Sequence, residues 1–112
     1  SHPRSFGSQA RVLSRYVREQ KVLTLENAIR KMTSLPARFL RMEDRGLLLS
    51  GYKADIAIFD PEATRENATH ADARQYSTGT HSVIVNGEVV VEEGGYSGAL
   101  HGKLLTPNWR ID

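Results

Sequence analysis

A single dipeptide constrains the fold of this sequence more than any other feature. Asn86 and Gly87 lie between the apolar runs 82–85 and 88–91, and Asn-Gly suits a two-residue type I′ turn because both positions accept a positive φ. The sequence therefore predicts a β-hairpin whose cross-strand pairs would be Val85 with Glu88, Ile84 with Val89, and Val83 with Val90. Apolar residues would occupy both faces of this hairpin, so a second layer must cover whichever face the chain does not bury itself.

The hairpin belongs to a second half of the chain in which the hydrophobic period is two. After Gly46, Leu47–Leu49 is a short apolar run, and Asp55–Phe59 reads as a strand with apolar residues on both faces. That pattern is typical of a strand buried on both sides. The stretch from Pro61 to Thr80 has no clear periodicity, and we interpret it as an excursion, a functional loop or a mobile segment. The tail from Gly94 is expected to be extended.

Helical periodicity governs the first half of the chain. Apolar residues recur with helical spacing over residues 8–20 and 25–33, which predicts two amphipathic helices. Thr24 stands at the N-cap position of the second helix, and Ser34 could cap a third, short helix. The residues of that third helix that are expected to face inward are Phe39 and Leu40. Helices followed by strands predict the α+β class.

Length and composition narrow the classes of protein that fit. The 112 residues are enough for one domain with a modest core. Since the chain has no cysteine, disulfides and thiolate metal sites are excluded. No apolar run reaches the roughly 18 residues that a membrane span requires, and the N-terminus lacks the apolar core of a signal peptide. We therefore expect a soluble, cytoplasmic protein without a membrane partner.

Charge is distributed unevenly along the chain. Residues 1–53 contain 11 basic and 4 acidic side chains, whereas residues 54–112 contain 4 and 9, for a net charge of +2. Arg11, Arg15 and Arg18 recur at helical spacing and could track the phosphates of a nucleic acid. With a chain so near neutrality, we favour a solvated face, or one that pairs with a neighbouring acidic surface. No nucleic-acid partner is predicted on this interpretation.

Motifs that carry chemistry are scarce. The four histidines, His2, His70, His81 and His101, show none of the spacings typical of metal ligands. His70 and Asp72 could orient an imidazole, but in a polar loop we interpret this histidine as solvated. Residue spacing therefore predicts neither a catalytic residue nor a metal ligand in this chain.

Longer strings of residues resemble a known family. Gly46-Leu-Leu-Leu-Ser-Gly51-Tyr-Lys-Ala54-Asp55-Ile-Ala-Ile-Phe-Asp60 is similar to the C-terminal signature of the amidohydrolase superfamily, in which a short strand lies between the two glycines. The hairpin 83–91 resembles the one that usually follows this signature. Within the superfamily, residues 2–4, 11–18 and 31–36 are most similar to N-acyl-D-amino-acid deacylases, or D-aminoacylases. The resemblance extends from His2 to about Leu105.

This resemblance implies a parent enzyme several times longer than the chain. Such enzymes combine a metal-dependent (β/α)₈ barrel with a small β-sandwich and hydrolyse N-acyl-D-amino acids to a carboxylate and a D-amino acid. Residues 1–45 would form the helical end of the barrel domain, and residues 46–112 the C-terminal part of the sandwich. A Zn²⁺ ion would polarise the scissile carbonyl and supply hydroxide. The rest of the parent enzyme is then the main partner of this chain.

The family's catalytic residues do not map onto this sequence. The metal ligands and the general acid/base Asp of these enzymes precede the matched region, so no catalytic or metal-binding position is carried over. His2 and Arg4 would lie in the loop that leaves the active-site end of the barrel. As a fragment, the chain is expected to be inactive, to expose apolar surface and to self-associate.

Two other interpretations stay open on the sequence. The chain could be a stand-alone interaction module whose basic helical face binds nucleic acid. It could also belong to another amidohydrolase, such as a relative of hydantoinase or dihydroorotase.

Overall fold

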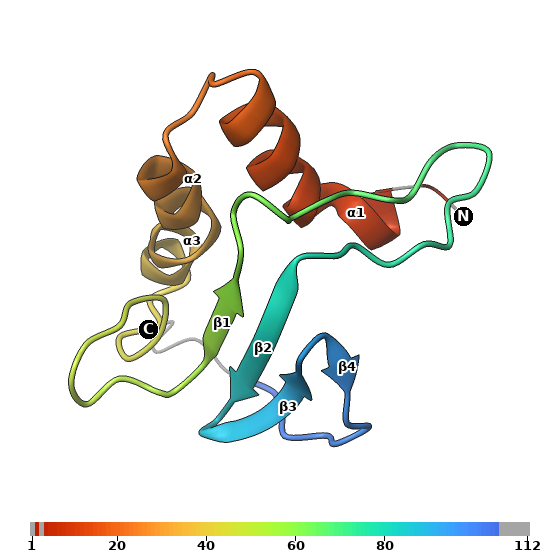
Figure 1. Ribbon diagram of the computed structural model, residues 1–112. Helices are drawn as coiled ribbons and strands as arrows, with labels where there is room; N and C mark the ends of the chain where they lie inside the picture. Colours follow the sequence, from red (N-terminus) through yellow and green to blue (C-terminus); the bar gives the residue numbers. More distant parts are fainter. Residues whose placement is uncertain (1, 3, 106–112) are drawn as a thin grey trace.

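The computed structural model describes residues 2 and 4–105, without the side chains of Ser5 and Phe6. Its helices come first along the chain and its strands second (Figure 1). The helices are α1 (Arg4–Arg11), the π-helix η1 (Val12–Glu19), α2 (Leu25–Met32) and α3 (Ser34–Phe39). The strands are β1 (Ile56–Phe59), β2 (Thr80–Val85), β3 (Glu88–Glu92) and β4 (Gly95–Tyr96). All neighbours are antiparallel in the order β1-β2-β3-β4, so the predicted α+β arrangement is confirmed at this level.

A side-chain cap explains where α2 begins. Thr24 Oγ1 accepts a hydrogen bond from the backbone N–H of Asn27 at 3.2 Å, as the sequence predicts. The prediction that Ser34 caps α3 is wrong, because Ser34 is already helical and Thr33 occupies the N-cap position. Thr33 also ends α2, and its hydroxyl donates to Ile29 O at 2.7 Å, so α3 has no side-chain cap.

Helix α1 begins before the predicted residue 8 and continues without a break into a wider helix. In η1 the ladder extends to a five-residue spacing, with the N–H of Gln20 donating to Arg15 O at 2.8 Å. Helices of this type are rare. A hydrophobic period near 3.6 does not distinguish them from an α-helix, so the sequence pattern located this helix without giving its type.

The hairpin β2–β3 turns at Asn86 and Gly87, whose φ angles are 49° and 81°. Val85 pairs with Glu88 and Ile84 with Val89, but the next pair joins Val83 to Val91. A bulge causes this shift, since one extra residue of β3, Val90, fits between the two pairs. The expected Val83–Val90 pair is therefore wrong. Strand β4, which pairs Val91 with Tyr96, lies in the tail that was expected to be merely extended.

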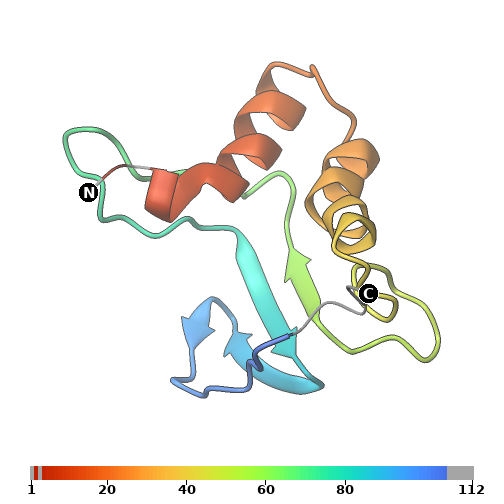
Figure 2. The same ribbon diagram turned by 180° about the vertical axis from the view of Figure 1, so that it is seen from behind.

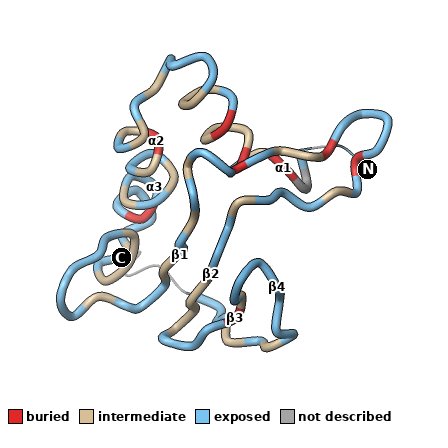
Figure 3. Tube along the Cα trace, in the orientation of Figure 1, coloured by how far each residue is buried: buried red, intermediate tan, exposed pale blue. Residues whose placement is uncertain are grey.

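The helices do not pack against the sheet, so the facing surfaces of both remain uncovered. Across the described residues no helix contacts a strand. In Figure 2, α1 and η1 lie above the strands, and α2 and α3 stand to one side of β1. The radius of gyration is 15.4 Å, against about 13 Å for a compact chain of this length. Burial is accordingly sparse (Figure 3), and the hydrophobic residues that are buried are Ala10, Ala28, Ala37, Ala68, Ala73 and Val90.

Several residues that were expected to be internal are therefore on the surface. Phe39 is 85% exposed and Leu40 44%, because α3 packs only against α2 among the described elements. Ile58 of β1 is 50% exposed, so the predicted burial of this strand on both faces is wrong for the chain alone. Leu47–Leu49 forms no strand, since no described segment pairs with it, and all three leucines are exposed.

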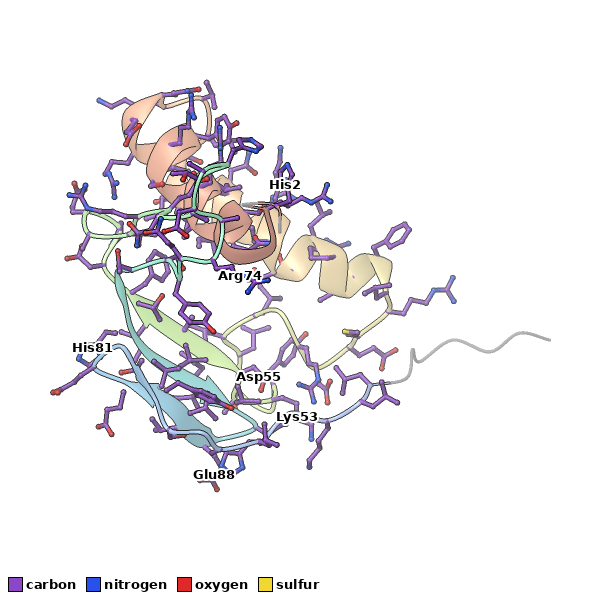
Figure 4. All side chains as sticks on the ribbon, turned by 90° about the vertical axis from the view of Figure 1, so that its right-hand side faces the viewer. His2, Lys53, Asp55, Arg74, His81 and Glu88 are labelled. Atoms are coloured by element: carbon purple, nitrogen blue, oxygen red, sulfur yellow. The ribbon has the colours of Figure 1, made fainter. Side chains whose placement is uncertain are left out.

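A polar cluster joins the segment before β1 to the hairpin turn. Asp55 Oδ1 accepts a hydrogen bond from the N–H of Asn86 at 2.8 Å, and Asp55 Oδ2 pairs with the Arg45 guanidinium. The side-chain amide of Asn86 donates to His101 O at 2.7 Å. Figure 4 shows Asp55 beside the sheet, far from His2. Asp55 therefore links Arg45 to the hairpin turn at Asn86, and Asn86 continues the cluster to His101.

Replacing Asp55 with alanine should loosen this hairpin. A charged hydrogen-bond acceptor contributes about 2 kcal/mol, so the opening equilibrium of the Asn86 amide should rise about 30-fold. Native-state hydrogen exchange of the protein that contains this chain measures that change. Glu88→Ala, an exposed change in the same hairpin, should alter the exchange by less than about threefold. Equal exchange rates of the Asn86 amide in the two variants would show that Asp55 does not stabilise the hairpin.

Candidate functional site

The segment between β1 and β2 is an excursion from the sheet, which we define as residues 60–79. It runs alongside α1 in both Figure 1 and Figure 2. Its base is closed by a hydrogen bond from the N–H of Asp60 to Gly79 O at 3.0 Å, and by an antiparallel bridge between Arg65 and Thr78. Of the three interpretations of this stretch, the structure favours an excursion with its own internal contacts.

Two arginines of the basic stripe, which we define as Arg11, Arg15 and Arg18, hold the excursion against the helices. Arg11 forms an ion pair with Glu66 at 3.3 Å, and Arg18 Nη1 donates to Pro61 O at 2.7 Å. A hydrogen bond to the Tyr16 side chain and the charge of Glu66 raise the pKa of Arg11 above its ordinary value. The prediction that this stripe pairs with a neighbouring acidic surface is confirmed for Arg11.

A solvent-open cavity of about 490 Å³ lies between the N-terminal end of α1 and the excursion. The residues with titratable or charged side chains around it are His2, Arg4, Arg11, Arg15, Glu66 and His70. Three guanidinium groups face one carboxylate, so the cavity is positively charged. We take this cavity as the candidate functional site.

His2 and Arg4, which the family resemblance placed in a loop, line the same cavity. The loop placement is wrong for Arg4, which is the first residue of α1. The N–H of Arg4 donates to His2 Nδ1 at 3.0 Å. The ring of His2 meets the ring of His70 edge to face, with centroids 5.1 Å apart and planes at 86°. His70 is an exposed loop residue, as predicted. The prediction did not include its contact with His2, and no local sequence signal could have revealed it.

The other histidines lie elsewhere. His81 Nδ1 is 2.5 Å from Ser82 Oγ, and the carbonyl of His101 accepts from Asn86 at the hairpin. Over residues 2 and 4–105 there is no group of three or more His, Cys, Asp or Glu side chains that could hold a metal ion. Among those same residues, none of the helices has the length and apolar character to cross a bilayer.

This geometry supports binding better than bond-breaking. A guanidinium group binds a carboxylate or phosphate through two parallel hydrogen bonds, and Arg4 and Arg15 are exposed beside the cavity. A hydrolytic centre would in addition need a metal or a paired nucleophile and base. The cavity can therefore position an anionic group, and the reacting atoms would have to be supplied by other residues.

Comparison with known proteins gives this site a context. The profile of the amidohydrolase family matches residues 4–91. N-acyl-D-aspartate deacylase of Alcaligenes xylosoxydans xylosoxydans is 42% identical over 106 residues, which cover 95% of this chain and 21% of the relative. The chain spans about a fifth of the length of the curated relatives that it matches.

Two solved structures are also similar. A crystal structure of D-aminoacylase aligns with a TM-score of 0.90 and 38% identity, covering 94% of this chain and 22% of that one. N-acyl-D-glutamate deacylase from Bordetella bronchiseptica, solved with zinc and a phosphonate inhibitor, aligns with a TM-score of 0.78 and 46% identity. That alignment covers 80% of this chain and 19% of the deacylase.

Proposed function

Because the chain belongs to the amidohydrolase family, we propose that it is the C-terminal part of a larger enzyme that hydrolyses N-acyl-D-amino acids. The reaction cleaves the amide bond with water and gives a carboxylate and a free D-amino acid. One observation carries the proposal: the chain aligns along 94% of its length with D-aminoacylase at a TM-score of 0.90 and 38% identity.

The proposed enzyme divides this chain between two domains. Residues 1–45 belong to the end of a (β/α)₈ barrel, and residues 46–112 to the C-terminal part of a small β-sandwich. The absence of any helix–strand contact among the described residues supports this division, as do the apolar side chains that stay exposed on both parts. The remaining strands and the barrel are contributed by the rest of the enzyme, which is the partner of this chain. A cytoplasmic location stays a prediction.

Zinc is proposed for the whole enzyme, since the similar N-acyl-D-glutamate deacylase was solved with this metal. The described residues of this chain do not fit a zinc site, because they offer no cluster of three ligands. Zinc chemistry therefore belongs to the part of the enzyme that this chain does not supply. The chain's own contribution is to shape and charge one edge of the active site.

His2 and Arg4 are proposed to line that edge. Every N-acyl-amino acid carries a carboxylate, and the cavity beside these two residues is positively charged. Arg4 is exposed and lies at the first position of α1, where the His2 imidazole accepts its N–H. The pair contributes by its position and charge rather than by exchanging protons with the substrate.

Purified full-length enzyme should hydrolyse N-acetyl-D-glutamate, N-acetyl-D-aspartate or a neutral N-acetyl-D-amino acid in the presence of Zn²⁺, and the L-enantiomers should be poor substrates. The 112-residue chain with added Zn²⁺ should show no turnover, since its described residues offer no group of three metal ligands. Release of the free amino acid measures both reactions. Turnover by the chain alone would overturn the claim that catalysis resides elsewhere. Hydrolysis of dihydroorotate or a hydantoin, without hydrolysis of N-acyl-D-amino acids, would move the enzyme to another branch of the family.

Nucleic-acid binding is the weaker alternative. Two of the three arginines that suggested it are engaged within the chain, Arg11 with Glu66 and Arg18 with Pro61 O. A phosphate-tracking face would keep these guanidinium groups free for the ligand. Retention on heparin that falls steeply with salt and weakens in Arg15→Ala would restore the alternative.

A further inference from the structure

The tip of the excursion reaches the candidate site through His70. Residues 69–72 form a tight turn, in which the N–H of Thr69 donates to Asp72 O at 2.9 Å and the N–H of Asp72 donates to Thr69 Oγ1 at 3.0 Å. His70 lies within this turn, so its backbone is restrained by hydrogen bonds on both sides. Its ring lies edge to face against His2, with centroids 5.1 Å apart.

The tip is also fixed against α1 by close packing. Ala68 is 5% exposed, and a Cβ atom at Gly7 would lie 2.9 Å from Glu66 Cγ and 3.7 Å from Ala68 Cβ. The Arg11–Glu66 ion pair adds a polar contact one turn further along the helix. The glycine at position 7 therefore lets the excursion lie close against α1, with its tip beside the cavity.

We propose that His70 is a positioning residue for the active-site edge, acting on Arg4 through His2. The contacts form a chain of two steps: the His70 ring packs on the His2 ring, and His2 Nδ1 accepts the N–H of Arg4. When the imidazole of His2 is held in place, its hydrogen bond restrains the backbone of Arg4, the first residue of α1. The position from which the Arg4 side chain extends is then restrained as well. Ser8 Oγ, which donates to Arg4 O at 3.1 Å, restrains the same residue from the other side. The inference rests on the proposed function for its kinetic consequence, but the contacts themselves do not depend on it.

The matched variants differ in what they leave of the ring contact. His70→Ala removes the edge-to-face pair, His70→Phe keeps an aromatic ring without the imidazole nitrogens, and His81→Ala removes an exposed histidine from the sheet, away from the cavity (Figure 4). In the full-length enzyme, His70→Ala should lower kcat/KM by about three- to tenfold, the range that an edge-to-face aromatic pair supports. The loss should appear mainly as a higher KM, because Arg4 positions the substrate. His70→Phe should recover most of the activity, and His81→Ala should equal the wild type.

Hydrogen exchange at the Arg4 amide tests the positioning role of His70 separately from the proposed enzymatic function. The His2–Arg4 hydrogen bond protects this amide, so exchange should accelerate in His70→Ala and return toward the wild-type rate in His70→Phe, whether or not the enzyme is active. If exchange responds while the wild type hydrolyses no N-acyl-D-amino acid, the positioning role stands and the proposed function fails. If exchange and kcat/KM are unchanged in His70→Ala, the positioning role is overturned. Failure of His70→Phe to recover either quantity would also overturn it, because ring packing would not be the cause.

Discussion

Gly79→Ala should destabilise the base of the excursion by about 2–5 kcal/mol. Gly79 has a φ of +99°, a conformation that costs a residue with a Cβ atom about 1–2 kcal/mol. A Cβ atom there would also lie 2.4 Å from Thr64 Cα and 2.6 Å from Thr64 N. Since these are backbone atoms, no side chain can rotate away, and overpacking of this kind adds about 1–3 kcal/mol.

Hydrogen exchange in the full-length protein measures this loss. The amides of Asp60 and Thr64 donate to Gly79 O and Asp60 O, both at 3.0 Å, and their protection should fall by at least about 30-fold in Gly79→Ala. Activity should fall as well, because the base of the excursion fixes where its tip meets His2. Gly51→Ala is the matched control: Gly51 has a φ of +87° but nothing within 4 Å of the added atom. It should cost only about 1–2 kcal/mol, and equal losses at the two glycines would show that the close contact at Gly79 is relieved by movement.

Local sequence signals located most of the elements, β4 excepted, but not the contacts between them. The Thr24 cap and the β2–β3 turn depend on neighbouring residues, and both could be predicted from spacing. The bulge at Val90 could not, because it depends on how β3 must twist to pair with β2 and β4. The same holds for η1, whose wider ladder leaves no distinct hydrophobic period.

The candidate site could be predicted only in part, because it too depends on contacts between elements that are distant in sequence. His2 and Arg4 were found only through the family resemblance, since neither forms a chemical motif with its neighbours in sequence. His70 is 68 residues from His2 in the numbering, and only the docking of the excursion on α1 brings the two rings together. Apolar patterns in turn predicted burial for Phe39 and Ile58, but burial also requires a surface to pack against.

The 112-residue chain by itself should self-associate rather than behave as a stable monomer. Its buried hydrophobic residues are small, and among the described residues no large side chain is less than 2% exposed. Phe39 is 85% exposed and Leu48 79%, and covering each such side chain is worth about 1.5–3 kcal/mol. Light scattering after size-exclusion chromatography should show an apparent mass that rises with concentration. Phe39→Ser/Leu48→Ser should weaken this association by about 100-fold or more, whereas Glu43→Ser, a nearby exposed polar change, should leave it unchanged.

The same double substitution should act in the opposite direction on the full-length enzyme. If the rest of the enzyme covers α3 and the segment after Gly46, Phe39 and Leu48 are buried there, and exchanging them for serine costs about 3–6 kcal/mol of stability. In the chain alone, both residues are exposed, so the change improves solubility and costs the fold little. This account would be contradicted if the 112-residue chain unfolded cooperatively as a monomer. It would also be contradicted if Phe39→Ser/Leu48→Ser left the stability of the full-length enzyme unchanged. Either result would mean that the exposed apolar side chains need no covering surface.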